Sequence, residues 1–224
     1  MTEITTSALL AELHKSAGIV TEVVAKLDDA AVKAPSELPG WSRGHVLAHI
    51  AGIANAMARQ LEYAARGETV DIYDGGYEGR TKAIELAAGR GIAEHRDATE
   101  AALGRALRAF DGLVESGWNT RISFRNGTVL DGGLALWREL VIHATDLGTG
   151  RGPETLEPAV LRASFRLPLG QSPGRSEVRS ATTGPAPDCH RLGAAIGRHQ
   201  RHDHGHRRMA RRPDAYPGEL AGFC

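Results

Sequence analysis

Long apolar runs, net charge and paired cysteines are all scarce in this chain, and each scarcity excludes a class of protein. No apolar run reaches the length of a membrane-spanning helix. The 27 basic and 27 acidic residues cancel, which argues against binding to nucleic acid or an anionic membrane. The two cysteines, Cys189 and Cys224, lie toward the C-terminal end and do not describe a disulfide framework. Residues 1–16 lack the basic and apolar segments of a secretory signal, so we expect a soluble, cytoplasmic protein.

Helical periodicity dominates the first 150 of the 224 residues. Apolar residues recur three and four positions apart after Ser7, and again after Ser42, so both serines are predicted to cap helices. The first stripe comprises Leu10, Leu13, Ala17, Val20, Val24 and Leu27, and the second comprises Val46, Ile50, Ile53, Met57 and Leu61. A break between Pro35 and Gly40 separates the two predicted helices.

Two further helices are predicted before residue 150. Residues 79–116 form a long, alanine-rich segment in which Gly89 and Gly91 indicate a bend. Asn126–Gly127 predicts a short hairpin, and Asp131 is predicted to cap a last helix that ends at Gly148. Four amphipathic helices predict an all-α four-helix bundle, a fold that builds metal sites from facing helices.

The composition changes after residue 150. We divide the chain into a bundle at 1–150, a connector at 151–169 and an irregular segment at 170–224. The last segment is rich in arginine, proline, glycine and histidine, and no period persists in it. It fits either a disordered tail or an aberrant sequence, for example a GC-rich gene read out of frame. The abrupt change of composition favours the second interpretation.

Metal-competent side chains interrupt two of the apolar helices. His49 stands in GHVLAHIAG, and Glu139 and His143 stand one helical turn apart in WRELVIHATDLG. Two imidazoles and one carboxylate suit Zn²⁺ and leave a coordination position open. His45 and His49 are also four residues apart, so HVLAH could itself be a two-histidine site. Asp146 could orient an imidazole or simply lie exposed near the helix end.

The segments PGWSRGHVLAHIAGIANAM and LWRELVIHATDLG resemble the mycothiol-dependent maleylpyruvate isomerases of the DinB-like four-helix superfamily. The resemblance covers roughly residues 5–165. It implies zinc ligands at His49, Glu139 and His143, with His45 as a neighbour. Family members continue into a small α/β domain that contributes an arginine to the active site. The irregular C-terminal residues of this chain stand in its place and show no resemblance to it.

The resemblance implies zinc and mycothiol as cofactors and a small dicarboxylate-like substrate, with no nucleic acid or membrane partner. The thiolate of mycothiol would add to the cis double bond of maleylpyruvate, and rotation and elimination would give fumarylpyruvate. A cation is needed near the developing enolate charge. The sequence does not choose among five arginines, Arg43, Arg80, Arg121, Arg125 and Arg138. The alternatives are another thiol-dependent transferase of the superfamily and a non-catalytic metal-binding or regulatory bundle.

Overall fold

The computed structural model describes residues 4–150, and all regular structure in that range is helical. The predicted all-α fold is therefore confirmed. The α-helices are α1 (Thr6–Ala25), α2 (Asp29–Lys33), α3 (Arg43–Ala64), α4 (Gly76–Ala88), α5 (Ile92–Asp111) and α6 (Val129–Asp146). Two short 3-10 helices, η1 (Glu115–Asn119) and η2 (Phe124–Asn126), precede α6. The predicted connector and irregular C-terminal segment lie outside the described residues.

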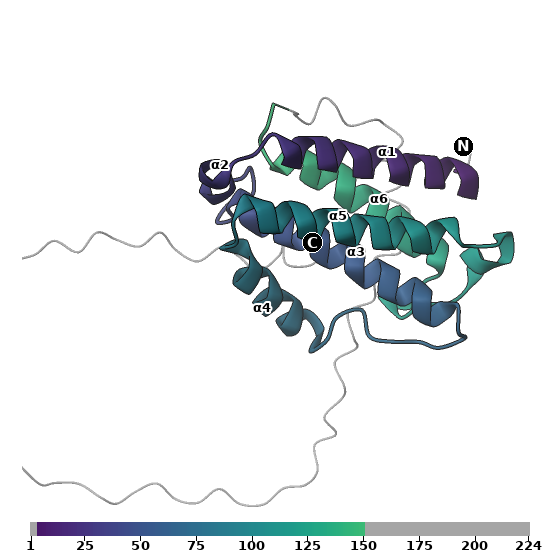
Figure 1. Ribbon diagram of the computed structural model, residues 1–224. Helices are drawn as coiled ribbons and strands as arrows, with labels where there is room; N and C mark the ends of the chain where they lie inside the picture. The colour runs from purple at the N-terminus through teal and green to yellow at the C-terminus, as the bar shows by residue number, and fades with distance from the viewer. Residues whose placement is uncertain (1–3, 151–224) are drawn as a thin grey trace, which may run out of the picture. The chain divides into compact units, whose positions relative to one another are not determined.

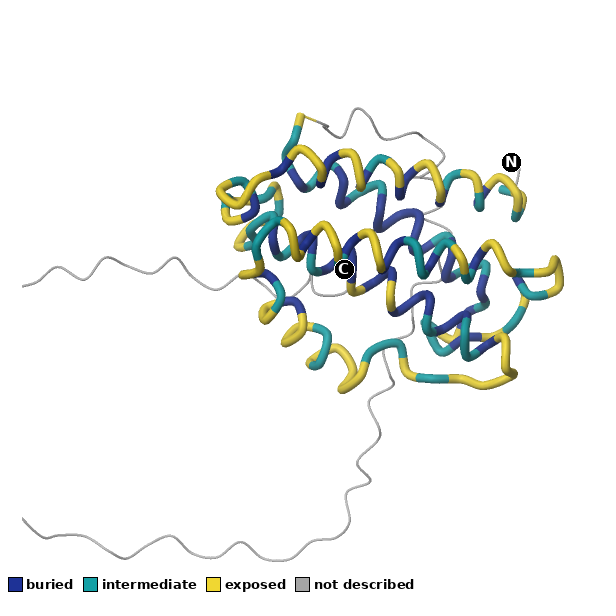
Figure 2. Tube along the Cα trace, viewed as in Figure 1, coloured by how far each residue is buried: buried dark blue, intermediate teal, exposed yellow. Residues whose placement is uncertain are grey.

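Four of these helices form the bundle. The α1 helix packs against α5 and α6, and α3 packs against the same two helices from the other side (Figure 1). Buried residues follow the sides on which the helices face one another, and exposed residues follow the outer sides (Figure 2). Large apolar side chains fill the centre, including Trp137, Phe110, Leu9, Leu13 and Met57. The bundle therefore has its own core, while α4 lies outside it and packs along α3.

Hydroxyl side chains cap the N-termini of α1, α3 and α6. Ser42 caps α3, as predicted. Two other predicted caps are wrong by a few residues, because Thr5 rather than Ser7 caps α1, and Thr128 rather than Asp131 caps α6. Asp131 instead lies three residues inside α6 and accepts a hydrogen bond from the backbone N–H of Thr128. A carboxylate at this position completes a capping box, so its role is reciprocal to that of the cap.

The long helix predicted for residues 79–116 is two helices. Gly89 ends α4 and Gly91 begins α5, so the glycines mark a break where the sequence predicted a bend. The break lets α5 return along α3 as part of the bundle, while α4 projects from the same region over α3 (Figure 1).

The predicted hairpin before α6 is a compact turn. A single antiparallel bridge joins Arg121 to Thr128, and no strand occurs between residues 4 and 150. The positive φ angles fall on Arg125 (51°) and Asn126 (53°), one position earlier than the Asn126–Gly127 signal implies. Asparagine tolerates this left-handed conformation better than most residues, so the signal placed the turn correctly within one residue.

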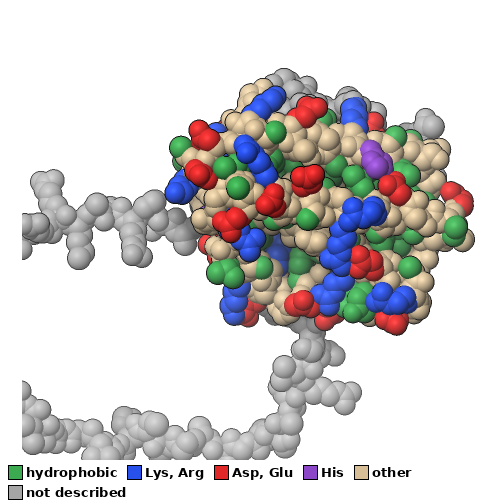
Figure 3. Space-filling model, in the orientation of Figure 1, with side chains coloured by type: hydrophobic (Ala, Val, Ile, Leu, Met, Phe, Trp, Pro, Cys, Tyr) green, Lys and Arg blue, Asp and Glu red, His purple; other side chains and the backbone are tan. Residues whose placement is uncertain are grey.

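The surface carries mixed charge. Figure 3 shows lysine and arginine side chains interspersed with aspartate and glutamate on the face in view. Among residues 4–150, no helix combines the length and apolar character needed to cross a membrane.

Close packing of α4 on α3 depends on Gly44, which gives a test of the fold. A Cβ at Gly44 would lie 2.2 Å from the backbone oxygen of Ala88, the last residue of α4. Gly44→Ala should destabilise the protein by about 1–3 kcal/mol, because backbone must move to admit the methyl group. Urea unfolding measures this change. Gly52→Ala is the matched control in the same helix, since a Cβ there meets no atom within 4 Å. Equal effects of the two substitutions would contradict the proposed contact.

Candidate metal centre

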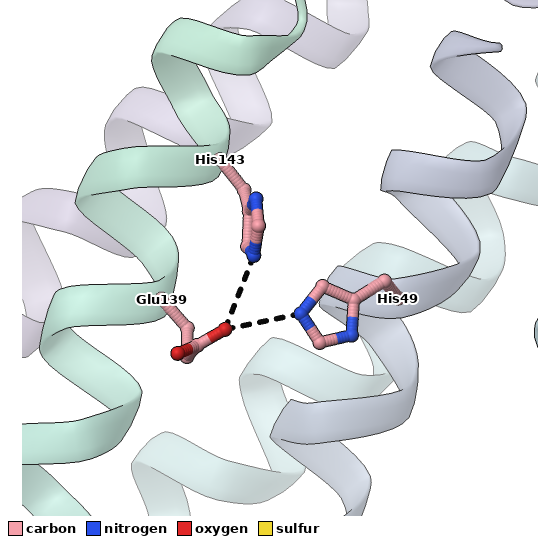
Figure 4. Close-up of side chains that lie close together, drawn as sticks. All are labelled: His49, Glu139 and His143. Carbon is pink, nitrogen blue, oxygen red and sulfur yellow. Dashed lines mark hydrogen bonds and ion pairs between the residues drawn. The ribbon is translucent and has the colours of Figure 1, made fainter. Parts of the chain in front are cut away.

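Two neighbouring bundle helices bring the three candidate ligands together. His49 comes from α3, and Glu139 and His143 come from successive turns of α6, which packs against α3. The three side chains point toward one another between the helices (Figure 4). They are almost fully buried, with relative exposures of 2%, 6% and 2% respectively. Burying a carboxylate and two imidazoles costs free energy unless each polar atom has a hydrogen-bonding, ionic or metal partner. The three side chains must therefore be partnered within this cluster.

One oxygen of Glu139 lies at the meeting point of both rings. Its Oε2 is 3.0 Å from Nε2 of His49 and 3.1 Å from Nε2 of His143. The two rings meet edge to face, with their centroids 4.5 Å apart. All three ligand atoms lie within 4.8 Å of one another, and no fourth such residue joins them among residues 4–150.

The separations between Glu139 and the two histidines are close to those of a zinc site. With bonds of about 2.0–2.1 Å to nitrogen and oxygen, tetrahedral ligand atoms lie roughly 3.3 Å apart. The distances from Glu139 to the two histidines are close to this value, so small side-chain movements would suffice to admit the ion. Three protein ligands in the described part of the chain leave a position for an exchangeable ligand, which is the arrangement of catalytic zinc.

A second set of residues holds the three candidate ligands. Asp146 Oδ2 lies 2.7 Å from Nδ1 of His143, which is the orienting position considered for it from the sequence. Arg80, from α4, places Nη2 3.0 Å from Nδ1 of His49. Arg138 donates a hydrogen bond to Oε1 of Glu139, the oxygen that faces away from the histidines. Each candidate ligand therefore has a polar partner on its outer side.

The protonation states follow from these contacts. Burial alone would raise the pKa of Glu139, but hydrogen bonds from His143 and His49 outweigh it and hold that pKa well below its usual range. Burial disfavours charge on His143, yet its hydrogen bonds with Asp146 and Glu139 raise its pKa to about 8. Burial lowers the pKa of His49 to about 4. At neutral pH without metal, the centre thus holds a carboxylate, one imidazolium and one neutral imidazole.

Metal binding to this centre must displace protons. The Nε2 atoms of both histidines carry hydrogen when they donate to Glu139, and each must present a lone pair to a metal. The imidazolium of His143 would lose a proton, so binding should release protons to solvent. His143 Nδ1 can keep its hydrogen, because the Asp146 carboxylate accepts it.

His45 is held elsewhere. Its Nδ1 accepts a hydrogen bond from the backbone N–H of Ser42 at 3.2 Å, within the cap of α3. Its Nε2 lies 3.4 Å from an oxygen of Glu85. Both ring nitrogens are therefore directed away from Glu139 and His143, and the structure lends no support to a two-histidine site at HVLAH.

Two of the five arginines considered from the sequence lie at the centre, namely Arg80 and Arg138. The other three arginines serve local structure. Arg43 donates hydrogen bonds to the carbonyls of Leu147 and Gly148. Arg121 donates to the carbonyl of Asn126, and Arg125 lies over the ring of Phe124.

Two aromatic residues near the centre were missed from the sequence. The rings of Trp41 and His49 lie at 71° to each other in a T-shaped arrangement, with centroids 6.0 Å apart. Tyr73 lies beside Arg80, whose guanidinium carbon is 5.9 Å from the ring centroid, and burial raises the pKa of Tyr73 to about 12. Both residues precede helices in loop segments, where no periodicity indicates which side chains turn inward. For Trp41, its place in the PGWS segment was a usable signal.

Comparisons with known proteins assign the described helices to a family. The family model for the mycothiol maleylpyruvate isomerase N-terminal domain matches residues 13–148, more than half of the chain. The chain belongs to this isomerase family. The match to the mycothiol maleylpyruvate isomerase N-terminal domain includes all three candidate ligands and both site arginines. No curated protein sequence matches the chain.

Two solved structures share the fold. One is the mycothiol-dependent maleylpyruvate isomerase and the other is a histidine-to-alanine mutant of such an isomerase. Their sequences are 23% and 22% identical to this chain, and both superpose with a TM-score of 0.69. Each alignment covers 73% of this chain and 70% of the other. At this identity the likeness establishes a common fold and leaves the chemistry to be argued from the residues.

Proposed function

We propose that this protein binds zinc through His49, Glu139 and His143 and uses mycothiol to isomerise maleylpyruvate to fumarylpyruvate. The observation that supports this proposal is the convergence of both imidazoles on one carboxylate oxygen in a buried cluster of side chains. Membership of the isomerase family supports the choice of thiol and substrate. When bound, zinc would favour the thiolate form of the thiol, whose reversible addition to the cis double bond permits rotation.

The chain's own residues would hold the reactive groups in place. Glu139 is kept anionic by its hydrogen bonds and anchored by Arg138, so it is available as a ligand at neutral pH. Asp146 fixes the ring of His143 with its Nε2 toward the centre. Trp41 packs against His49 and excludes water from that side of the ring. Arg80 brings positive charge next to the centre, where an enolate or carboxylate of the substrate needs it.

Mycothiol dependence of turnover is the direct test. We expect zinc-loaded protein to isomerise maleylpyruvate with mycothiol, and at least about tenfold more slowly with cysteine, because the remote parts of mycothiol supply binding energy. Absorbance of the keto acid reports the rate. His45→Ala is the control variant and should keep the rate.

Other outcomes of the same assay would decide between the alternatives. Isomerisation at equal rates with and without thiol would rule out the addition–elimination scheme. Mycothiol binding without isomerisation would favour another thiol-dependent transfer reaction. Zinc binding with no affinity for mycothiol would favour a non-catalytic, metal-binding bundle.

A further inference from the structure

Arg80 reaches the metal centre from outside the bundle. It belongs to α4, which packs along α3, and its Nη2 lies 3.0 Å from Nδ1 of His49. Its guanidinium also lies beside the ring of Tyr73. The side chain of Arg80 therefore lies between the candidate ligand His49 and the aromatic ring of Tyr73.

The contact with His49 fixes where that ring carries its hydrogen. A guanidinium can only donate hydrogen bonds, so Nδ1 of His49 must accept from Arg80. The hydrogen of the neutral ring then sits on Nε2, where it is donated to Glu139 at 3.0 Å. This tautomer stabilises the metal-free centre.

The same tautomer is incompatible with a metal on Nε2. A metal requires the Nε2 lone pair, so the hydrogen of a neutral imidazole must move to Nδ1. Nδ1–H and the Arg80 guanidinium would then be two donors facing each other. Arg80 cannot keep its hydrogen bond to His49 in the metal-bound centre.

Neighbouring residues thus prepare the two histidines for opposite states of the centre. The Asp146 carboxylate accepts a hydrogen bond from Nδ1–H of His143. This contact leaves Nε2 available and so prepares the histidine to bind metal. Arg80 prepares His49 for the metal-free state instead. This difference between the two histidines gives Arg80 a role that depends on whether metal is bound.

We propose that metal binding displaces Arg80 from His49 and frees its guanidinium to bind a carboxylate of the substrate beside the metal. Arg80 would then be a positioning residue that couples metal occupancy to anion binding. A guanidinium released at this place suits a carboxylate, because its paired N–H groups match the two oxygens. The anion-binding part rests on the proposed function, whereas the displacement from His49 does not.

Zinc affinity tests the displacement without any measurement of turnover. Arg80→Met removes the donor and keeps an unbranched apolar stem, so zinc should bind about tenfold more tightly in a chelator competition. Asp146→Asn should weaken zinc binding, by about 10–100-fold, because it replaces the charged acceptor of the other histidine with a weaker, neutral one. Lys82→Met is the charge control, since Lys82 is exposed on the same helix and pairs with Glu78. It should leave the affinity unchanged. Unchanged or weaker binding in Arg80→Met would overturn the displacement.

Nitrogen-15 NMR of the histidine rings gives a readout that a purely structural role would not move. In metal-free protein, Nδ1 of His49 should be unprotonated, and in zinc-loaded protein it should carry hydrogen. Arg80→Met should lose the fixed tautomer of the metal-free ring. Persistence of an unprotonated Nδ1 in the zinc form would show that Arg80 stays bound to His49, against the proposal.

Maleate, a stable cis dicarboxylate, tests the anion-binding part by calorimetry. Zinc-loaded protein should bind maleate more tightly than metal-free protein, and Arg80→Met should lose about tenfold of that affinity while Lys82→Met does not. Equal maleate affinity in the zinc-loaded wild type and Arg80→Met would overturn this part. Because neither probe requires mycothiol or turnover, failure of the isomerase assay would be distinguishable from failure of this proposal.

Discussion

Replacing His49, Glu139 or His143 with alanine is expected to empty the zinc site, whereas His45→Ala should retain about one zinc per chain. Each of the three contributes a ligand atom to a group that spans only 4.8 Å, and no other described residue is placed to substitute. The loss in affinity should exceed the roughly 10–100-fold that removal of a ligand's hydrogen-bond partner costs. Metal analysis of protein purified in parallel, followed by chelator competition, measures the effect.

His45→Ala is a demanding control because His45 is so near in sequence. It lies one turn before His49 on α3 and contributes to the cap of that helix. Its loss should lower stability slightly and leave zinc content unchanged. A site emptied by His45→Ala and preserved in Glu139→Ala would show that the ligand assignment is wrong. Circular dichroism of each variant excludes unfolding as the cause of metal loss.

The bundle and the three-residue centre were predictable because they depend on local period and on strong chemical preference. Polar residues at His49, Glu139 and His143 interrupt apolar stripes, and only a shared partner accounts for burying them. The four-residue spacing places Glu139 and His143 on one face whatever surrounds the helix. The pairing of α3 with α6 follows from the bundle itself.

The surroundings of the centre could not be read in the same way. The role of Arg80 depends on how α4 folds back over α3 after a loop, and no sequence period records that crossing. The break at Gly89–Gly91 was underestimated because glycine permits either a bend or an end, and tertiary packing decides between them. Choosing among five arginines therefore required the three-dimensional arrangement.

Removing Glu139 should cost the metal-free protein much of its stability, because the buried guanidinium of Arg138 would lose this carboxylate. Both side chains are about nine-tenths buried, and Arg138 donates to Oε1 of Glu139. Glu139→Leu removes the carboxylate from the guanidinium and from both histidines at once. Breaking a buried pair in this way should cost about 3–5 kcal/mol, a large fraction of the stability of an ordinary domain. Urea unfolding in the presence of a chelator measures the loss.

The double variant Arg138→Met/Glu139→Leu separates this electrostatic cost from loss of packing. Methionine and leucine keep much of the side-chain volume and leave no buried cation beside the missing carboxylate, so stability should return to the wild-type level or exceed it by about 1–4 kcal/mol. Zinc binding should remain absent, because a ligand is gone. If the double variant were as unstable as Glu139→Leu, the cost would lie with the two histidines rather than with Arg138. Stability above the wild-type level without recovery of zinc would show that the glutamate is maintained in the core for its chemistry, at the expense of the stability that an apolar residue pair would provide.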